Sequence, residues 1–205
     1  MNSLQHSYAS RREHILLPLA DRLETHLKDL FHGFPRIDRI VVRAKSIERF
    51  LAKAMKQENS KLKYDDPLNQ IQDQIGARIV TFYRSDVECV RKEIGKYFSY
   101  IESKEIVPET EREFGYEGRH FILVVPPDIE DEKTSKDDSI EFFELQIKTL
   151  FQHAWSEAEH DLGYKPKCTL TTEQKRRLAF TAAQAWGADL IFEDLHQQTT
   201  KLPIT

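Results

Sequence analysis

The chain has 205 residues, of which 40% are hydrophobic and 31% are charged, and its formal net charge is −4. This length is enough for one substantial hydrophobic core with a helical appendage, and the composition is that of an ordinary globular protein. The negative net charge excludes binding of nucleic acid through overall positive charge. Any affinity for polyphosphates must therefore come from local groups of basic residues.

The cysteines and the apolar runs indicate the compartment. The two cysteines, Cys89 and Cys168, lie in unrelated sequence contexts and predict neither a disulfide framework nor a zinc site, which agrees with a reducing environment. No apolar run approaches membrane-spanning length, and the first residues lack the apolar core of a signal peptide. We therefore expect a cytoplasmic protein that has no membrane partner.

The first third of the chain predicts two helices with a strand between them. An apolar stripe predicts a helix over 4–30, which ends at Gly33 and Pro35. A short strand is expected over 37–42 and a second helix over 46–58. The turn at 64–67 is a suitable start for a further helix at Pro67.

The rest of the chain alternates between strand and helix patterns and predicts an α/β (α+β) fold. We expect helices over 86–98, 149–162 and 172–196, the first with Asp86 as its N-cap, and strands over 77–82, 101–107, 119–125 and 141–148. The polar segment 126–139 should be an exposed loop. Strands flanked by helices at both ends predict one domain around a mixed, mostly antiparallel sheet.

The segment 143–165 is the most informative part of the sequence. Glu144, Gln146 and Lys148 alternate with apolar residues, so that one face of the strand presents an acid, an amide and a base. A helix with apolar residues at helical spacing follows directly. A strand with aligned polar groups that leads into a helix is typical of a phosphate or metal site, although a solvated strand face gives the same pattern.

Basic residues and an aspartate precede this segment. Arg43, Lys45 and Lys53 can grip a triphosphate through charge-assisted hydrogen bonds, or can form an ordinary solvated surface. Asp73 lies just before Gly76, where it can ligate magnesium or simply begin a turn, and Arg78 follows in the next strand. Glu144 would complete a two-carboxylate magnesium site with Asp73.

Two further patterns contain aromatic and histidine residues. In the segment 114–120, Tyr116 offers a flat face for a nucleobase and His120 a nearby donor, but the same residues can form a hairpin turn. His153, Glu157 and His160 share one helical face. Their spacing is not that of a zinc-binding HExxH motif, so we regard a metal site there as the weaker interpretation.

Taken in chain order, these patterns resemble the synthetase domain of the RelA/SpoT family, the alarmone synthetases. The matching pieces are RAKSIERFLAKAMK, IQDQIGARIV, GYEGRH and ELQIKTLFQHAWSEAEHDLGYK. The resemblance implies a nucleotidyltransferase-like fold with a mixed five-stranded sheet flanked by helices. It also implies one synthetase domain over 1–205, with an N-terminal helix in 1–35, the catalytic core in 36–165 and a C-terminal helix in 166–205.

The resemblance also implies an activity, a cofactor and a role for each candidate residue. The family transfers pyrophosphate from ATP to the 3′-hydroxyl of GDP or GTP with Mg²⁺, which makes (p)ppGpp and AMP. The ATP-binding residues would be Arg43, Lys45, Lys53 and Arg78. Asp73 and Glu144 would bind the metal and act in catalysis, and the acceptor-binding residues would be Tyr116, His120, Gln146 and Lys148.

Departures from the family pattern leave the acceptor open. The segment before the glycine-tyrosine element, IVPETEREF, is acidic where the long synthetases carry basic residues, and Lys148 stands where arginine is common. Two alternatives follow: a toxic relative that modifies the tRNA 3′ end or an adenosine nucleotide, and a catalytically silent module that binds nucleotide. The apolar stripes of the first and last helices fit either a homo-oligomer or packing within one chain.

Overall fold

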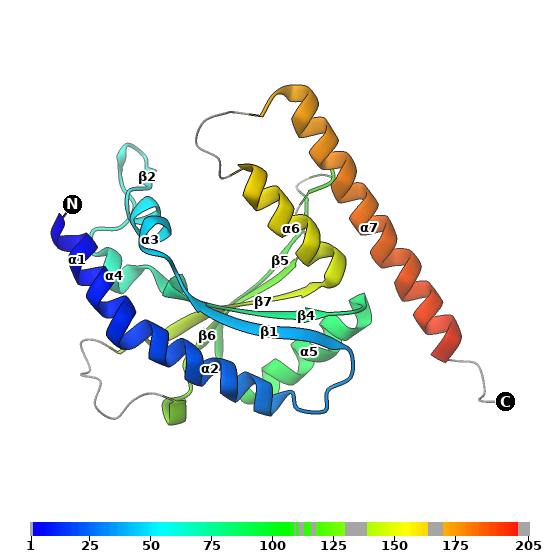
Figure 1. Ribbon diagram of the computed structural model, residues 1–205, viewed down its shortest axis with the longest axis horizontal. Coiled ribbons are helices and arrows are strands. Elements are labelled where there is room, and N and C mark those ends of the chain that lie inside the picture. Colours follow the sequence, from blue (N-terminus) through cyan, green and yellow to red (C-terminus); the bar gives the residue numbers. More distant parts are fainter. Residues whose placement is uncertain are drawn as a thin grey trace.

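The computed structural model describes residues 2–108, 110, 113–115, 118–129, 139–163 and 170–200. Its centre is a five-stranded sheet with helices on both faces (Figure 1). On one face α2 (Leu17–Leu30) packs on β1 and α5 (Arg84–Tyr97) packs on β4 and β7. On the other face α6 (Leu150–Gly163) packs on β4 and β7.

The sheet has the strand order β1-β4-β7-β6-β5. Its strands are β1 (Ile37–Ala44), β4 (Ile75–Thr81), β7 (Phe142–Thr149), β6 (Gly118–Val124) and β5 (Tyr100–Ile106). The central pair of β4 and β7 is parallel, and the other three pairs are antiparallel. The predicted mixed, mostly antiparallel five-stranded sheet is confirmed.

The hydrophobic core lies between one face of the sheet and helices α2 and α5. Alternate strand residues such as Ile79, Leu145 and Ile147 are completely buried there, together with Leu23 of α2 and Ile94 of α5. Since successive side chains of a strand point to opposite faces, the residues between them must point toward α6. The position of the core therefore decides which polar residues face the other layer.

The predicted first helix is present, with one irregular turn. It consists of α1 (Asn2–Arg11), a π-helical turn (Arg12–Leu16) and α2. Pro18 lies at the beginning of α2, and it has no backbone N–H to bond one turn back and crowds the preceding carbonyl. A wider turn before the proline accommodates both effects without ending the helix.

The predicted end of the second helix was wrong. The second helix, α3, ends at Ala54 rather than at residue 58, because β2 (Gln57–Glu58) and β3 (Lys61–Leu62) form a small hairpin. Asn59 and Ser60 make its turn with φ values of 51° and 64°, a conformation typical of tight hairpin turns.

Asp86 was wrongly predicted as a helix N-cap. Helix α5 begins at Arg84, so Asp86 is its third residue. From there the Asp86 carboxylate accepts a hydrogen bond of 3.2 Å from the Tyr83 N–H and pairs with Arg36 at 2.8 Å. The aspartate therefore still fixes the start of the helix, but from inside the first turn.

The remaining elements connect the sheet to its helices. They are α4 (Pro67–Gln70), 3₁₀ turns at Gln72–Gln74 and Pro127–Ile129, and the long last helix α7 (Thr172–Thr200). The predicted helix start at Pro67 is confirmed. Most of the predicted loop 126–139 lies outside the described residues. No helix in the described ranges has a stretch long and apolar enough to cross a membrane.

Candidate active site

The polar face of the sheet carries two cross-strand rows of residues. Arg43 of β1, Gly76 of β4 and Glu144 of β7 are aligned in the first row. In the second row, Arg78 of β4 is paired with Gln146 of β7. Aligned residues on neighbouring strands lie about 5 Å apart, so these positions are brought together by register alone.

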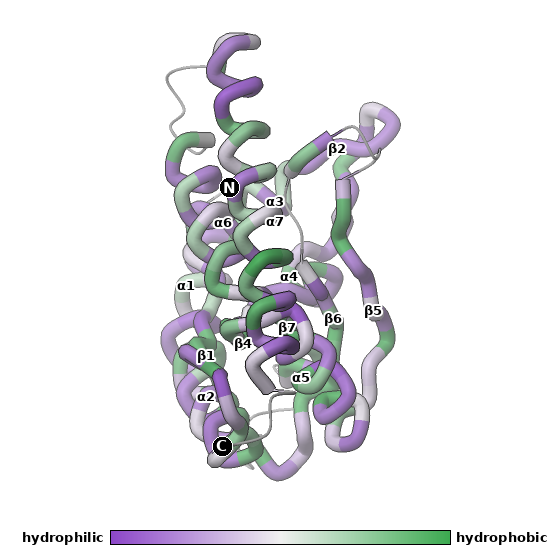
Figure 2. The backbone as a smooth tube through the Cα atoms, turned by 90° about the vertical axis from the view of Figure 1, so that its right-hand side faces the viewer, coloured by the Kyte–Doolittle hydropathy of each residue, from purple (hydrophilic) through white to green (hydrophobic). Residues whose placement is uncertain are grey.

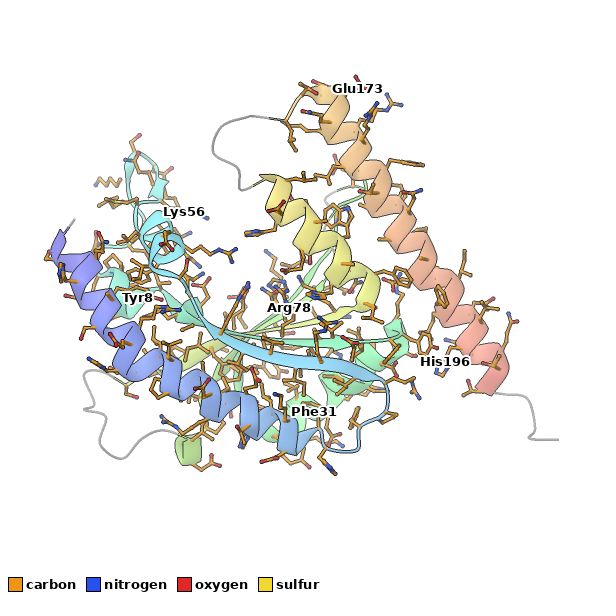
Figure 3. All side chains as sticks on the ribbon, viewed as in Figure 1. Tyr8, Phe31, Lys56, Arg78, Glu173 and His196 are labelled. Atoms are coloured by element: carbon orange, nitrogen blue, oxygen red, sulfur yellow. The ribbon has the colours of Figure 1, made fainter. Side chains whose placement is uncertain are left out.

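A cleft of about 550 Å³ opens above these rows. In Figure 3, Arg78 projects from the sheet toward the space between α3 (Ile47–Ala54) and α6. The cleft contains most of the site residues predicted from the sequence, and these are Arg43, Lys45, Asp73, Arg78, Glu144 and Gln146.

Gly76 leaves room at the floor of the cleft. It stands between Arg43 and Glu144 in the first row, and a Cβ added to it would meet nothing within 4 Å. Because this position carries no side chain, a ligand can approach the strand backbone between a cation and a carboxylate.

Asp73 is held by two lysines at the edge of the cleft. The Nζ atoms of Lys45 and Lys53 each lie 2.8 Å from its Oδ2 atom. Burial raises the pKa of Asp73, but the two ammonium groups more than offset this effect and keep the pKa below its ordinary value. Its Oδ1 atom is buried and has no hydrogen-bond partner among the described residues.

The first helix fixes the position of Lys45. The Tyr8 hydroxyl donates a hydrogen bond of 2.9 Å to the Lys45 carbonyl, and the Lys45 N–H donates one of 2.8 Å to the Gln74 carbonyl. Tyr8 itself is fully buried and stacks on Phe50 of α3 with 3.6 Å between ring centroids. The loop that presents the lysine and the turn that presents Asp73 are thus tied together.

Glu144 is the second acidic group in the cleft. His120 Nδ1 lies 2.9 Å from its Oε1 atom, and Gln146 Nε2 donates a hydrogen bond of 3.0 Å to its Oε2 atom. Burial and the negative charge of Asp73 raise the pKa of Glu144. The hydrogen bond and charge of His120 and the hydrogen bond from Gln146 lower this pKa by a larger amount, so the net shift is downward. Both carboxyl groups are therefore ionised at neutral pH.

These two carboxylates fit a magnesium ion that also binds substrate phosphates. No cluster of three or more histidine, cysteine or acidic residues in the described part of the chain forms a complete protein-made metal site. Magnesium commonly takes only one or two carboxylates and completes its shell with phosphate oxygens and water. The buried Oδ1 atom of Asp73, which has no hydrogen-bond partner, is an available oxygen ligand of the required kind.

Arg78 is held by residues from two elements. Its Nη1 atom lies 3.2 Å from His153 Nδ1 and also contacts a carboxylate oxygen of Glu157, and both of these residues belong to α6. Its Nη2 atom donates a longer hydrogen bond of 3.5 Å to Gln146. The guanidinium is therefore fixed over the polar face by α6 and β7 together.

The histidine and glutamate face of α6 binds arginines. His153 and Glu157 contact Arg78, and His160 Nδ1 lies 3.5 Å from Arg49 Nη2 of α3. The spacing that resembled a weak metal motif thus serves to join α6 to β4 and to the opposite wall of the cleft. Arg49 belongs to the lining of the cleft and was not predicted from the sequence.

Lys148 lies deeper than its neighbours on β7. It is 2% exposed, and its Nζ atom donates a hydrogen bond of 3.0 Å to the Ser156 hydroxyl beneath α6. Burial, with a further contribution from Arg78, lowers the pKa of Lys148 to about 7. Lys148 is not among the residues that line the cleft.

The other predicted acceptor residues have different positions. His120 reaches the cleft through its contact with Glu144, whereas Tyr116 lies outside the described residues. Arg39 was missed although it also lines the cleft. Its position two residues before Val41 and four before Arg43 continues the alternation of β1, which is the signal that could have identified it.

Comparisons with known proteins give one family. The family model described as "Region found in RelA / SpoT proteins" matches residues 42–169. Among curated proteins, the chain is 28% identical over 117 residues to GTP pyrophosphokinase YjbM from Bacillus subtilis (strain 168). That match covers 55% of this chain and 53% of the relative, so the chain spans about half the length of this relative.

Solved structures share the fold. The small alarmone synthetase 1 from Bacillus subtilis superposes with a TM-score of 0.75 at 23% identity, covering 93% of this chain and 98% of the other. A second structure of that protein, bound to its product pppGpp, gives a TM-score of 0.72 at 23% identity and covers 91% and 96% of the two chains. The structural similarity thus covers more of the chain than residues 42–169, the range that the family model matches, and it includes the regions of α1–α2 and α7.

Proposed function

Because the chain belongs to the RelA/SpoT family, we propose that it transfers pyrophosphate from ATP to the 3′-hydroxyl of GDP or GTP, making (p)ppGpp and AMP. One observation supports this proposal most strongly. Asp73 and Glu144, which are 71 positions apart in the numbering, line one cleft, are both ionised, and are surrounded by basic residues. This is the arrangement that metal-assisted transfer between two nucleotides requires.

The donor would occupy the side of the cleft formed by β1, α3 and the Asp73 turn. Arg43, Lys45, Lys53 and Arg78 supply its positive charges. The ammonium groups of Lys45 and Lys53 lie on Asp73 Oδ2, so they are placed to contact phosphate oxygens that approach the same carboxylate. Arg43 and Arg78 stand on neighbouring rows of the sheet and would hold the rest of ATP.

Asp73 and Glu144 would hold Mg²⁺, which supplies Lewis-acid stabilisation of the charge on the transferring phosphoryl oxygens. Glu144 has a second assigned role, because its carboxylate is ionised and can accept the proton of the acceptor hydroxyl. His120 is bound to Glu144 Oε1 and would fix the orientation of that carboxylate.

The proposed reaction balances as an in-line displacement. The acceptor 3′-oxygen forms a bond to the β-phosphorus of ATP, the bond between this phosphorus and the α,β-bridging oxygen breaks, and AMP leaves with that oxygen. Tyr116 would stack on the acceptor base, with His120 and Gln146 near its ribose and phosphates, while Lys148, which is buried beneath α6, would support this part of the site without touching the acceptor. The chain mainly contributes positioning and charge, as is usual for phosphoryl transfer.

The comparisons support this substrate class. The curated relative is named a GTP pyrophosphokinase, and one structural neighbour is described as bound to its product pppGpp. Ionised Asp73 and Glu144 in one cleft favour an enzyme over a module that only binds nucleotide, since simple binding does not require two carboxylates beside a triphosphate.

The decisive experiment offers one labelled donor to several acceptors. The purified chain is incubated with magnesium and γ-labelled ATP, and GDP, GTP, ADP or deacylated tRNA is supplied in separate reactions. We expect label in guanosine tetra- or pentaphosphate, and Asp73→Asn should abolish it. Label found only in tRNA or in an adenosine product would show that the acceptor is not a guanosine nucleotide. Label in none of the four acceptors would refute the proposed transfer.

A further inference from the structure

Polar side chains of the first helix bind backbone carbonyls beside the cleft. The Tyr8 hydroxyl and Arg12 Nε both donate to the Lys45 carbonyl, at 2.9 and 3.2 Å. Arg11 Nη1 donates a hydrogen bond of 2.5 Å to the Leu68 carbonyl of α4. In two perpendicular views, Figure 1 and Figure 2 show α1 at the same height in the molecule as α3 and α4. Because α1 also contacts α3, the first helix lies against the donor side of the cleft.

The face of the first helix that makes these bonds is polar although it is largely buried. Tyr8 lies three positions before Arg11 and four before Arg12, which is the spacing of neighbours on one helical face. Tyr8 is fully buried and Arg11 is 8% exposed. Burial of a hydroxyl or a guanidinium costs free energy unless the group is hydrogen-bonded, so the carbonyl partners explain these residues better than packing alone. Burial also raises the pKa of Tyr8, so its hydroxyl keeps its proton and remains a donor.

The carbonyl that accepts two of these bonds belongs to the connection between β1 and α3. Lys45 directly follows the last residue of β1 and lies two positions before the first residue of α3. Its N–H donates to the Gln74 carbonyl at 2.8 Å, and its carbonyl accepts from Tyr8 and Arg12. The peptide groups on both sides of the Lys45 Cα atom are therefore held. Together they set the direction in which the lysine side chain leaves the backbone and reaches Asp73.

The turn that carries Asp73 is attached to the same helix. The Leu68 carbonyl, which accepts from Arg11, also accepts a hydrogen bond of 2.7 Å from Gln74 Nε2. Gln74 directly follows Asp73 in the chain. The lysine and the aspartate that meet in the cleft are thus both supported by the first helix, one through its carbonyl and the other through the neighbouring glutamine.

We propose that Tyr8 and Arg12 are positioning residues for the donor nucleotide. By donating to one carbonyl they fix the backbone at Lys45, and so they fix where its ammonium group meets the phosphate oxygens of a nucleoside triphosphate. The inference rests on the proposed function for the identity of this ligand, and it adds to the donor site a helix outside residues 42–169. Displacement of a substrate-positioning group by about 1 Å can cost about 10²-fold in rate, so loss of either bond weakens the site without unfolding the chain.

The first test measures the binding of α,β-methylene ATP with magnesium to the full chain by isothermal titration calorimetry. This analogue cannot react, because carbon replaces the bridging oxygen at the bond that would break. Tyr8→Phe keeps the ring on Phe50 and removes only the hydroxyl, so the dissociation constant should rise about threefold or more, as for the loss of one hydrogen bond. Arg12→Met should have at least the same effect. Arg12→Gln places an amide N–H where arginine has Nε, and it should restore most of the affinity.

Arg22→Met is the matched control for Arg12→Met. Arg22 lies on α2, and its Nε also donates to a backbone carbonyl, that of Ile129 at 2.7 Å, which is not part of the cleft lining. This control should leave the affinity for the analogue unchanged. In transfer assays, Tyr8→Phe should raise the KM for ATP about threefold or more and leave the KM for the acceptor unchanged. A general loss of folded protein does not produce this split between the two substrates.

The second test is a double-mutant cycle that shows whether Tyr8 acts through Lys45. In a Lys45→Met chain the ammonium group is absent, so adding Tyr8→Phe should cause no further loss of affinity for the analogue. A further loss as large as in the wild-type background would overturn the inference. So would wild-type affinity in both Tyr8→Phe and Arg12→Met, an equal loss in Arg22→Met, or a wild type that does not bind the analogue.

The two sets of measurements separate this inference from the proposed transfer. A wild type that binds the analogue and transfers no label refutes the transfer, while the binding constants of the variants still decide the roles of Tyr8 and Arg12. A wild type that transfers label, with variants that bind the analogue and use ATP as it does, leaves the transfer standing and removes both residues from the donor site.

Discussion

The two faces of strands β4 and β7 differ in what they contribute. On one face Ile79, Leu145 and Ile147 are completely buried against α2 and α5. On the other face, Arg78 and Glu144 line a cleft. The residues of the two faces alternate one by one along the same strands, so a shift of one residue in register would exchange core and site.

The comparison shows that the polar face is stabilised by specific pairs rather than by water alone. Glu144 is held by His120 and Gln146, and Arg78 is held by His153 and Glu157 of α6. Glu144 and Arg78 can be partly buried in this way because each has partners that replace its lost hydration. The same pairs keep the side chains in position for a substrate.

The largest expected effect comes from Glu144→Gln on the polar face. The substitution preserves shape but removes the charge, so we expect pyrophosphate transfer to fall by about 10²-fold or more, since both metal binding and proton acceptance are lost. The free energy of unfolding should change little, because the amide can retain a hydrogen bond with His120. Labelled transfer assays and urea denaturation test these two statements separately. A variant with full activity would remove Glu144 from its assigned role.

The neighbouring residue on the apolar face should behave in the opposite way. Leu145→Ala deletes a fully buried side chain and leaves a cavity, so we expect the free energy of unfolding to fall by about 2–5 kcal/mol. Transfer per folded molecule should stay close to wild type at a temperature where the variant is folded. A large loss of activity without a loss of stability would contradict the separation of the two faces.

The burial of Lys148 on the polar side of β7 should appear in the pH dependence of the free energy of unfolding. The pKa of Lys148 is about 7 in the folded chain, below the ordinary value of 10.5. Between these two pH values the unfolded chain binds more protons, so the free energy of unfolding should rise with pH over this interval. Lys148→Met should flatten this rise when both chains are unfolded in urea from pH 7 to 10. An unchanged slope would show that Lys148 is solvated rather than buried.

The smallest effect is expected at the rim of the cleft. The Ser46 hydroxyl caps α3 by accepting a hydrogen bond of 3.3 Å from the Arg49 N–H. Ser46→Ala should lower the free energy of unfolding by about 1 kcal/mol. Ser46→Asp is the matched control and should retain the stability, because aspartate is an equally good N-cap.

Local patterns predicted most of the secondary structure because they depend on neighbouring residues. Alternation identified the polar residues of β7, and the apolar stripe identified the first helix. The hairpin at 57–62 was missed because it is short, polar and formed by a turn at Asn59 and Ser60 rather than by an apolar pattern. Asp86 was misplaced because N-cap and third-residue aspartates have similar sequence contexts.

The amino-acid sequence by itself determined which residue types lie on each face of each strand, because the two-residue repeat of a strand and the helical repeat are properties of the local backbone. It also carried the motif order that matches the RelA/SpoT family. The tertiary structure decided which of these side chains meet. The register of β1, β4 and β7 brought Arg43, Gly76 and Glu144 into one row. The packing of α6 then joined His153 and Glu157 to Arg78 and buried Lys148, because such contacts link elements far apart in the chain.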